Sequence, residues 1–409
     1  MYDNNIFRIN SEKCFFYLIC LLWGYQAFFR FFGIVLRKIP IIGNMIMPFI
    51  FFVLIIGSLS FITKKIILLD ILFTLCVIFV SLLTIMLDLP STEPFNDLCF
   101  TFLSQCLVMY FVGISFYAKL RNNREILTVL TFISILSIFT LTIVYRSTSS
   151  GFDYEWNSNQ YIPYLLLPHI LLVMASVYEK VSVVKMLTLV YGVVNIVMLG
   201  NRGSTVCMLV MLFFLTYFKT EEMNKKRRLV LLLFIILVIA VVWMTNAYET
   251  ALLGMYKYAL DHNMSTRVFQ TFLGEFSSGT SLDSGRLEIQ KELIRQIKIN
   301  PFGYGLGGDR VFTGWYAHNI FLELIVQFGI FIGGFLCVFL VYIVISSLRK
   351  ARAEMQILSI LLLFICTGLI KLLISGSYLI EPYFFLLLGF AISIRRDKNL
   401  ISDQELLYQ

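Results

Sequence analysis

The sequence predicts an all-α polytopic membrane protein with about twelve transmembrane helices and one large extracytoplasmic loop between the ninth and tenth helices. The chain is 59% apolar, and apolar runs of about 18 residues or more recur along it. A single polar stretch of roughly 70 residues interrupts them, which is far longer than an ordinary connection. Because the bilayer core offers no water, the backbone of each apolar run must be hydrogen-bonded within one helix.

The apolar runs set the predicted organisation of the chain. The spans cover roughly residues 14–36, 44–63, 66–87, 97–118, 126–144, 160–178, 182–199, 203–218, 229–245, 318–348, 355–374 and 377–394. The predicted domains are nine helices in 1–244, an extracytoplasmic loop with short helices in 245–317, three helices in 318–396 and a cytoplasmic tail in 397–409. No internal repeat relates the two halves, which counts against the repeat-built transporters.

The net charge of +8 is distributed as in a membrane protein rather than a nucleic-acid-binding protein. Basic residues fall in alternate short connections, which is the positive-inside pattern and predicts both termini in the cytoplasm. These clusters are Lys64–Lys65, Lys119/Arg121/Arg124, Lys180, Lys225–Arg228, Arg349–Lys350/Arg352 and Arg395–Arg396/Lys398. Only Arg37–Lys38 departs from the pattern. The long polar loop is therefore expected on the extracytoplasmic side of the membrane.

The eight cysteines all lie in apolar segments and show no Cys-x-x-Cys spacing. A free cysteine behaves as a small apolar residue, so these are expected to be packing residues. No zinc site, other metal site or cofactor is predicted.

Within the loop, Asp283–Ile299 has an apolar side at helical spacing and ends at Asn300–Pro301, so it is expected to be a helix. The glycine-rich stretch Pro301–Gly308 follows. Spaced glycines resemble phosphate cradles, but a strand–loop–helix context and a following Lys-Ser/Thr are missing here. A turn that returns the loop to the membrane is the favoured interpretation.

Charged residues inside a membrane region are costly and mark candidate functional sites. Several are predicted at one level, the outer ends of their helices: Arg30, Arg202, His318, Glu323, Lys371 and Glu381. Arg267 and Arg286 in the loop can fold onto this level. Such a cluster suits a multivalent anion, for example a lipid pyrophosphate, because arginine donates paired hydrogen bonds to phosphate. The alternative is that long basic side chains extend to lipid headgroups.

His318 is the preferred general base, because it joins the loop to a membrane helix and imidazole titrates near neutrality. His169 is expected to be a packed histidine, and His262 has no evident partner. Arg286 opens the loop helix, where a cation opposes the helix dipole, which hints at a ligand. Glu323 has a simpler alternative, an ion pair with a neighbouring Lys or Arg.

Three passages resemble the O-antigen polymerase and O-antigen ligase family of membrane glycosyltransferases. The first is Gly200-Asn201-Arg202-Gly203-Ser204, similar to that family's Ser/Asn-Arg-Gly segment. The second runs from Ser284-Gly285-Arg286 to Asn300-Pro301-Phe302-Gly303-Tyr304-Gly305. The third is His318-Asn319 followed after nine residues by Gly329, as in the ligase signature. Ile332 departs from that signature, which prefers a small residue or Tyr there.

The resemblance implies a GT-C-like fold acting on undecaprenyl-pyrophosphate-linked oligosaccharide at the outer face of the bacterial cytoplasmic (inner) membrane. It implies that Arg202 and Arg286 bind the donor pyrophosphate and that His318 serves as base or as a hydrogen-bonding partner near the anomeric carbon. Substrate contacts are expected from Arg267, Lys371, Glu323, Arg30 and Glu381. Membrane lipid and a chain-length regulator are the other expected partners.

The function predicted from these features is a polysaccharide polymerase for O-antigen, capsule or exopolysaccharide. Two alternatives stay open. One is a ligase of the same family, which transfers finished glycan to a lipid or protein. The other is a flippase or transporter of lipid-linked oligosaccharide, which carries out no chemistry.

Overall fold

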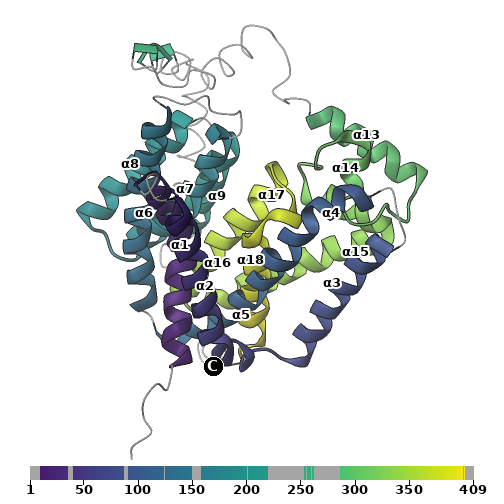
Figure 1. Ribbon diagram of the computed structural model, residues 1–409, viewed down its shortest axis with the longest axis horizontal. Coiled ribbons are helices and arrows are strands. Elements are labelled where there is room, and N and C mark those ends of the chain that lie inside the picture. The colour runs from purple at the N-terminus through teal and green to yellow at the C-terminus, as the bar shows by residue number, and fades with distance from the viewer. Residues whose placement is uncertain are drawn as a thin grey trace, which may run out of the picture.

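The computed structural model describes residues 10–35, 40–86, 91–123, 125–149, 158–199, 201–219, 253–254, 256–258, 260–261, 286–398 and 400. Every regular element in these ranges is helical (Figure 1). The first half contains α1 (Ser11–Val35), α2 (Pro40–Thr63), α3 (Leu68–Met86), α4 (Thr92–Thr101), α5 (Leu107–Asn122), α6 (Glu125–Ser149), α7 (Ser158–Glu179), α8 (Val183–Leu199) and α9 (Arg202–Lys219). The second contains α13 (Arg286–Ile299), α14 (Gly308–Thr313), α15 (Ile320–Ala351), α16 (Met355–Phe364), α17 (Lys371–Ile374) and α18 (Pro382–Arg396).

Some junctions between helices are continuous. A π-helical turn over Phe102–Cys106 joins α4 to α5, and another over Ile365–Ile370 joins α16 to α17. A 3₁₀ turn over Tyr378–Ile380 precedes α18. The predicted loop helix is confirmed from Arg286 to its end at Ile299.

The chain is a polytopic membrane protein. Six described helices are long and apolar enough to cross a bilayer: Leu68–Met86, Thr92–Asn122, Glu125–Val144, Ile162–Glu179, Ile320–Ala351 and Met355–Ile374. Three shorter apolar helices are Phe52–Thr63, Val183–Ile196 and Gly203–Phe218. The predicted span at 229–245 lies outside the described residues, and the total of twelve stays a prediction.

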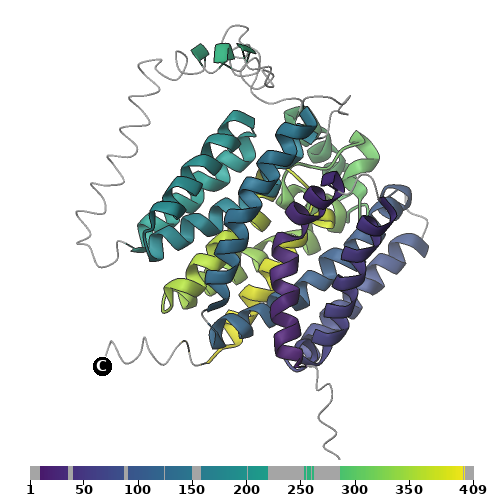
Figure 2. The same ribbon diagram turned by 60° about the vertical axis from the view of Figure 1, so that its left-hand side comes forward.

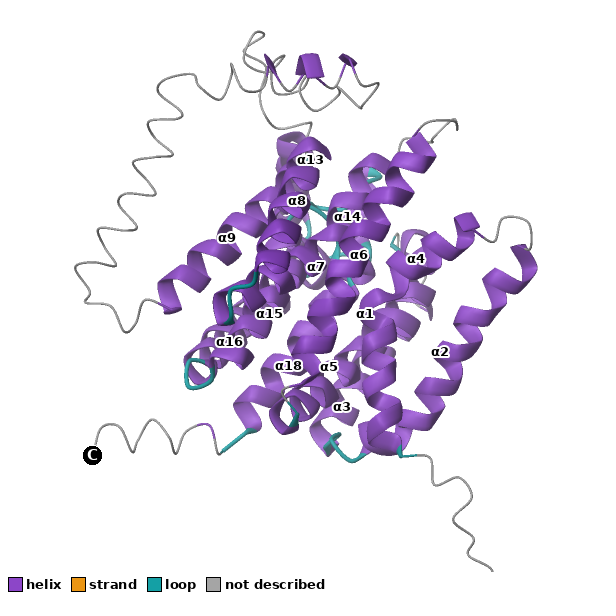
Figure 3. Cartoon of the chain, turned by 90° about the vertical axis from the view of Figure 1, so that its left-hand side faces the viewer, coloured by secondary structure: helices purple, strands orange, loops and turns teal. Residues whose placement is uncertain are grey.

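The helices pack as a bundle whose long members run in a common direction (Figures 2 and 3). α1 packs against α2 and α6, and α7 packs against α6, α8 and α9. α5 and α18 also pack closely against each other. A Cβ added to Gly389 would lie 2.0 Å from the Tyr110 carbonyl oxygen, and one added to Gly113 would lie 2.4 Å from the Leu386 carbonyl oxygen. Small residues therefore bring these two backbones together, as is usual between membrane helices.

The basic connections that the structure describes meet at one end of the bundle. Their contacts include Lys119–Glu12 at 2.8 Å, Arg121–Glu354, Arg396–Asp70 at 2.7 Å and Lys350 Nζ to the Arg395 carbonyl at 2.6 Å. Their common position agrees with the predicted alternation of connections. The assignment of this end to the cytoplasm stays a prediction. Arg37–Lys38, Arg124 and Lys225–Arg228 lie outside the described residues.

The loop segments gather at the opposite end, with α13 and α14 at the upper right of Figure 1 beside α4 and α15. α14 and α13 both contact α15. The Ser91 hydroxyl donates to the Tyr304 carbonyl at 2.7 Å, which joins the start of α4 to the glycine-rich turn. The part of the loop from α13 onward is therefore docked on the membrane helices.

The glycine-rich turn is inserted into a break in α15. Gly329 has φ 78° and ψ 173° inside the helix. The contacts across the break are Tyr304 N–H to the Val326 carbonyl at 3.0 Å, Gly305 N–H to the Gln327 carbonyl at 3.0 Å and Ile330 N–H to the Pro301 carbonyl at 2.8 Å. A Cβ on Gly303 would lie 2.4 Å from the Gly329 nitrogen. The turn supplies the hydrogen bonds that the broken helix lacks, so its amides are not a phosphate cradle.

The α5–α18 contact predicts opposite effects of two glycine substitutions. Gly389→Ala forces the backbones apart and should lower the free energy of unfolding by about 1–3 kcal/mol. Gly334→Ala on α15 meets nothing within 4 Å and should raise it by up to about 1 kcal/mol, because glycine disfavours a helix. Thermal unfolding in detergent measures both, and equal effects would contradict the packing.

Candidate functional site

His318 lies in the turn that begins α15. Its φ of 55° is in the left-handed region, which few residues other than glycine enter. The Asn319 side chain caps the helix by accepting hydrogen bonds from the amides of Phe321 and Leu322, at 3.0 and 3.3 Å. The imidazole packs on the Tyr316 ring, with 4.2 Å between centroids. The predicted base therefore sits on a defined turn at a helix N-terminus.

Arg286 is the first residue of α13, and it reaches back to the membrane helices. Its Nη1 donates to the Ile374 carbonyl at 2.8 Å. Ile374 ends α17, the short helix that Lys371 begins. The loop thus brings Arg286, a predicted pyrophosphate ligand, to the helix that carries Lys371, a predicted substrate contact. A guanidinium has further N–H donors for a ligand.

Lys371 and Glu381 form an ion pair in which both side chains are largely buried, at 16% and 8% exposed. The Lys371 ammonium also lies 4.8 Å from the centre of the Tyr164 ring, within range for a cation–π contact. Tyr164 is a member of the cluster that the sequence did not single out.

α9 begins at Arg202, next to the same cluster. A Cβ added to Gly203 would lie 2.0 Å from the Tyr164 hydroxyl oxygen, so Tyr164 rests on the first turn of α9. Arg30 lies in α1. The side chains of Arg30 and Arg202 lie outside the described part of the chain, as does the whole of Arg267.

Glu323 is fully buried. Its carboxylate accepts hydrogen bonds from the Ser377 hydroxyl and, at 3.4 Å, from the Tyr378 amide. The Gln327 amide group approaches it at 3.5 Å. The predicted alternative of an ion pair is not found among the described residues, where Glu323 instead holds the 3₁₀ turn that leads to α18.

Asp309 is a further buried acid beside Glu323, and sequence reasoning missed it. It accepts hydrogen bonds from the Ala317 amide at 3.1 Å and from Gln327 Nε2 at 2.8 Å. Gln327 Oε1 in turn accepts from the Tyr378 hydroxyl. Burial raises the pKa of the Asp309 carboxyl, while Arg310 and the Gln327 bond act in the opposite direction. Asp309, Gln327 and Tyr378 therefore link the turn before His318 to the turn before α18.

One sequence signal points to part of this network. Gln327 follows Glu323 by four residues, so the two share a face of one helix. The other partners come from segments distant in the chain. Asp309 is the sole acid of the glycine-rich turn and α14, which is a weak signal.

The remaining histidines lie apart from the cluster. His169 is buried, with Nδ1 3.3 Å from the Ser134 hydroxyl, which accepts a hydrogen bond from the Trp23 indole at 2.7 Å. It is a packed, hydrogen-bonded histidine as predicted. His262 lies outside the described residues.

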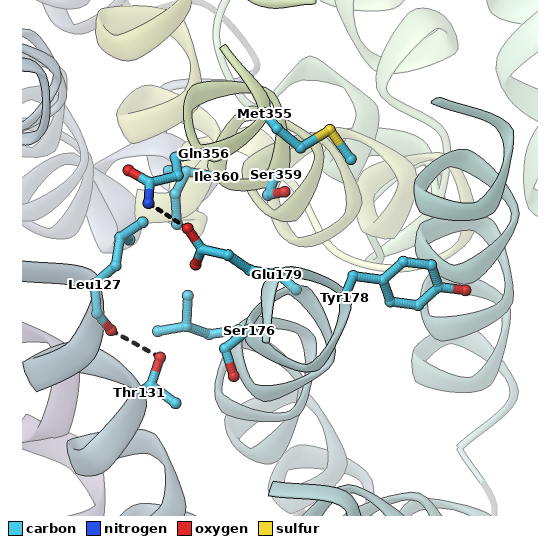
Figure 4. Close-up of a pocket in the computed structure, with 11 residues that line it drawn as sticks. Leu127, Thr131, Ser176, Tyr178, Glu179, Met355, Gln356, Ser359 and Ile360 are labelled. Atoms are coloured by element: carbon cyan, nitrogen blue, oxygen red, sulfur yellow. Dashed lines mark hydrogen bonds between the residues drawn. The ribbon is translucent and has the colours of Figure 1, made fainter. Parts of the chain in front are cut away.

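A small pocket lies at the far end of α7 (Figure 4). Leu127, Glu179, Met355 and Gln356 are among its lining residues, and Gln356 donates a hydrogen bond to Glu179. Glu179 follows Tyr164 by fifteen residues, which is about 22 Å of helix. The pocket therefore belongs to the basic end of the bundle and not to the cluster around Arg286.

The described residues offer few ligands for a metal. No group of three or more His, Cys, Asp or Glu side chains is placed to hold an ion in these ranges. All eight cysteines are free, and Cys106, Cys207 and Cys366 are buried as packing residues. Ile332, where the chain departs from the ligase signature, is 61% exposed, so its side chain points away from the site.

Comparison with known proteins gives one match. Residues 187–339 match the family model described as O-Antigen ligase. The range includes Arg202, Arg286, His318 and the Gly329 break. No curated protein and no solved structure matches the chain. The family match confirms the resemblance seen in the sequence and supports a polysaccharide ligase- or polymerase-type role.

The Lys371–Glu381 pair allows a structural role to be separated from a binding role. Lys371→Met leaves Glu381 buried without its partner, which should cost about 3–5 kcal/mol of stability. Exchange of the two residues, Lys371→Glu with Glu381→Lys, should recover part of that loss because the pair is rebuilt.

Thermal unfolding measures the stability of these variants, and glycan transfer in membranes measures their function. We expect the exchanged variant to stay inactive, because the cation has moved away from Arg286. Full activity in the exchanged variant would show that Lys371 acts only through its ion pair.

Proposed function

We propose that this chain, whose residues 187–339 carry a domain of the O-antigen ligase family, is a polysaccharide polymerase. It would transfer a growing glycan from undecaprenyl pyrophosphate to a sugar hydroxyl of a lipid-linked repeat unit. The observation that carries the proposal is the contact of Arg286 with the Ile374 carbonyl. This contact joins the polar loop to the Lys371–Glu381 end of the membrane helices.

The cations of this cluster would bind the donor pyrophosphate. Arg286 has N–H donors beyond the one it gives to Ile374, and Lys371 lies on the same short helix as Ile374. Arg202 at the start of α9 would add a third cation. The leaving group gains negative charge as the glycosidic bond breaks, and fixed cationic donors that stabilise such charge are commonly the largest catalytic contribution.

His318 would act as the general base. It takes the proton of the acceptor hydroxyl while that oxygen forms a bond to the anomeric carbon of the donor. The bond from the anomeric carbon to the phosphate oxygen breaks, and its electron pair leaves with undecaprenyl pyrophosphate. Base catalysis of this kind contributes roughly 10²–10⁴-fold. The step needs no redox partner and no nucleotide sugar.

Two buried acids would keep the residues of this site in position. Glu323 bonds to the turn before α18, and Glu381 neutralises Lys371. Their burial favours a supporting role over direct contact with sugar. A GT-C-like fold, an inner-membrane location and cytoplasmic termini are part of the proposal.

A ligase is the second candidate, favoured by the printed description of the matched family. Both activities use the same donor and differ in the acceptor. A deletion strain distinguishes them. Loss of a polymerase leaves single repeats on the surface, whereas loss of a ligase leaves long chains on undecaprenyl pyrophosphate. Repeats trapped inside the cell would instead point to a flippase and contradict both.

Two substitutions test the assigned chemistry. Arg286→Gln removes a cation from the proposed pyrophosphate site. His318→Asn keeps a residue that tolerates the left-handed turn but removes the base. Both should reduce chain growth at least about 100-fold at normal protein level. Polymer length and yield on gels report the result.

The matched control is Arg295→Gln. Arg295 lies on the same helix, is 63% exposed and pairs with Glu292, so its loss should leave polymer unchanged. Normal polymer from both Arg286→Gln and His318→Asn would overturn the site assignment. An equal defect in Arg295→Gln would show that the effect is one of net charge.

A further inference from the structure

We propose that Asp309 is a positioning residue for His318. Its carboxylate accepts the amide hydrogen of Ala317, the residue directly before His318, and it is anchored from below by Gln327. This inference rests on the proposed function for His318 as base and deepens it. The role is indirect, because Asp309 is fully buried.

The backbone at His318 needs such support. A φ of 55° is unfavourable for a residue with a Cβ, and residues in this region persist only where their surroundings hold them. Asn319 secures the turn on its C-terminal side by capping α15. Asp309 secures the N-terminal side through the Ala317 amide at 3.1 Å. The backbone of the His318 turn is thus held on both sides.

Gln327 fixes Asp309 in turn. Its Nε2 donates to Asp309 at 2.8 Å, and its Oε1 accepts from the Tyr378 hydroxyl. Tyr378 lies in the 3₁₀ turn that ends at Ile380, next to Glu381, the partner of Lys371. These hydrogen bonds therefore link the residue before His318 to the turn that precedes Glu381.

Other elements face Asp309 as well. Arg310 Nη1 lies 4.0 Å from its carboxylate, and the Thr313 hydroxyl bonds its backbone carbonyl at 3.0 Å. Glu323, on the same side of α15 as Gln327, completes the group. The Ala317 bond is the link from this group to the His318 turn.

The test compares two substitutions in a reconstituted assay with a lipid-linked repeat unit as donor and acceptor. Asp309→Ala removes both hydrogen bonds and should lower kcat about 100-fold, because a displacement of about 1 Å is enough for such a loss. KM for the donor should stay within about threefold, since the pyrophosphate ligands are untouched. Asp309→Asn keeps an oxygen for the Ala317 amide and should restore most of kcat.

A double-mutant cycle shows whether Asp309 acts through His318. In a His318→Asn background, Asp309→Ala should change the residual rate by less than about threefold, because residues acting as one unit are not additive. Equal losses in both backgrounds would overturn the proposal. So would a rise in KM at unchanged kcat. Glu292→Gln, which alters a carboxylate on α13 bonded to Arg295 and Gln296, is the control and should behave as wild type.

Hydrogen exchange tests the positioning without activity. In the wild-type protein the Ala317 amide should be protected, and Asp309→Ala should speed its exchange at least about tenfold while α13 is unchanged. Unchanged exchange at Ala317 would refute the proposed contact. If the wild-type protein transfers no glycan, the proposed function fails, whereas the exchange result still decides whether Asp309 holds this turn.

Discussion

The structure depends on one buried hydrogen-bonded group beneath the docked loop. Gln327 is its centre, because it bonds Asp309 from the loop and Tyr378 from the turn before α18. Polar groups buried at this depth are costly unless every member has a partner. The group therefore ties three distant segments together, and with them the positions of His318 and the Lys371–Glu381 pair.

The break in α15 also attaches the loop to the membrane helices. An interrupted helix exposes amides and carbonyls, which a membrane protein must satisfy internally. The turn after Pro301 supplies those partners, and Gly303 and Gly329 make the close approach possible. Gly303 and Gly329 come from two of the passages that resemble the family, and in the structure they contact each other. This contact fixes the position of the end of α13 relative to the break in α15.

The sequence predicted the class, the six described helices that are long enough to cross a membrane and the helix that Arg286 begins. Hydrophobic runs and caps are local signals, so a single sequence can carry them. It also predicted that Arg286 and Lys371 lie at the same level, near the outer ends of the membrane helices. It did not predict the partners of Glu323, the position of Asp309 or the use of Tyr164. Those depend on contacts between residues far apart in the chain, and no local pattern encodes them.

The central claim is that Arg286 and Lys371 form one pyrophosphate site above the buried group. A cryo-electron microscopy structure with bound undecaprenyl pyrophosphate tests it most directly. The account predicts phosphate oxygens within about 3 Å of the Arg286 guanidinium and close to the Lys371 ammonium, with His318 facing the outer phosphate. A pyrophosphate bound elsewhere, for example beside Glu179 at the opposite end of α7, would contradict it.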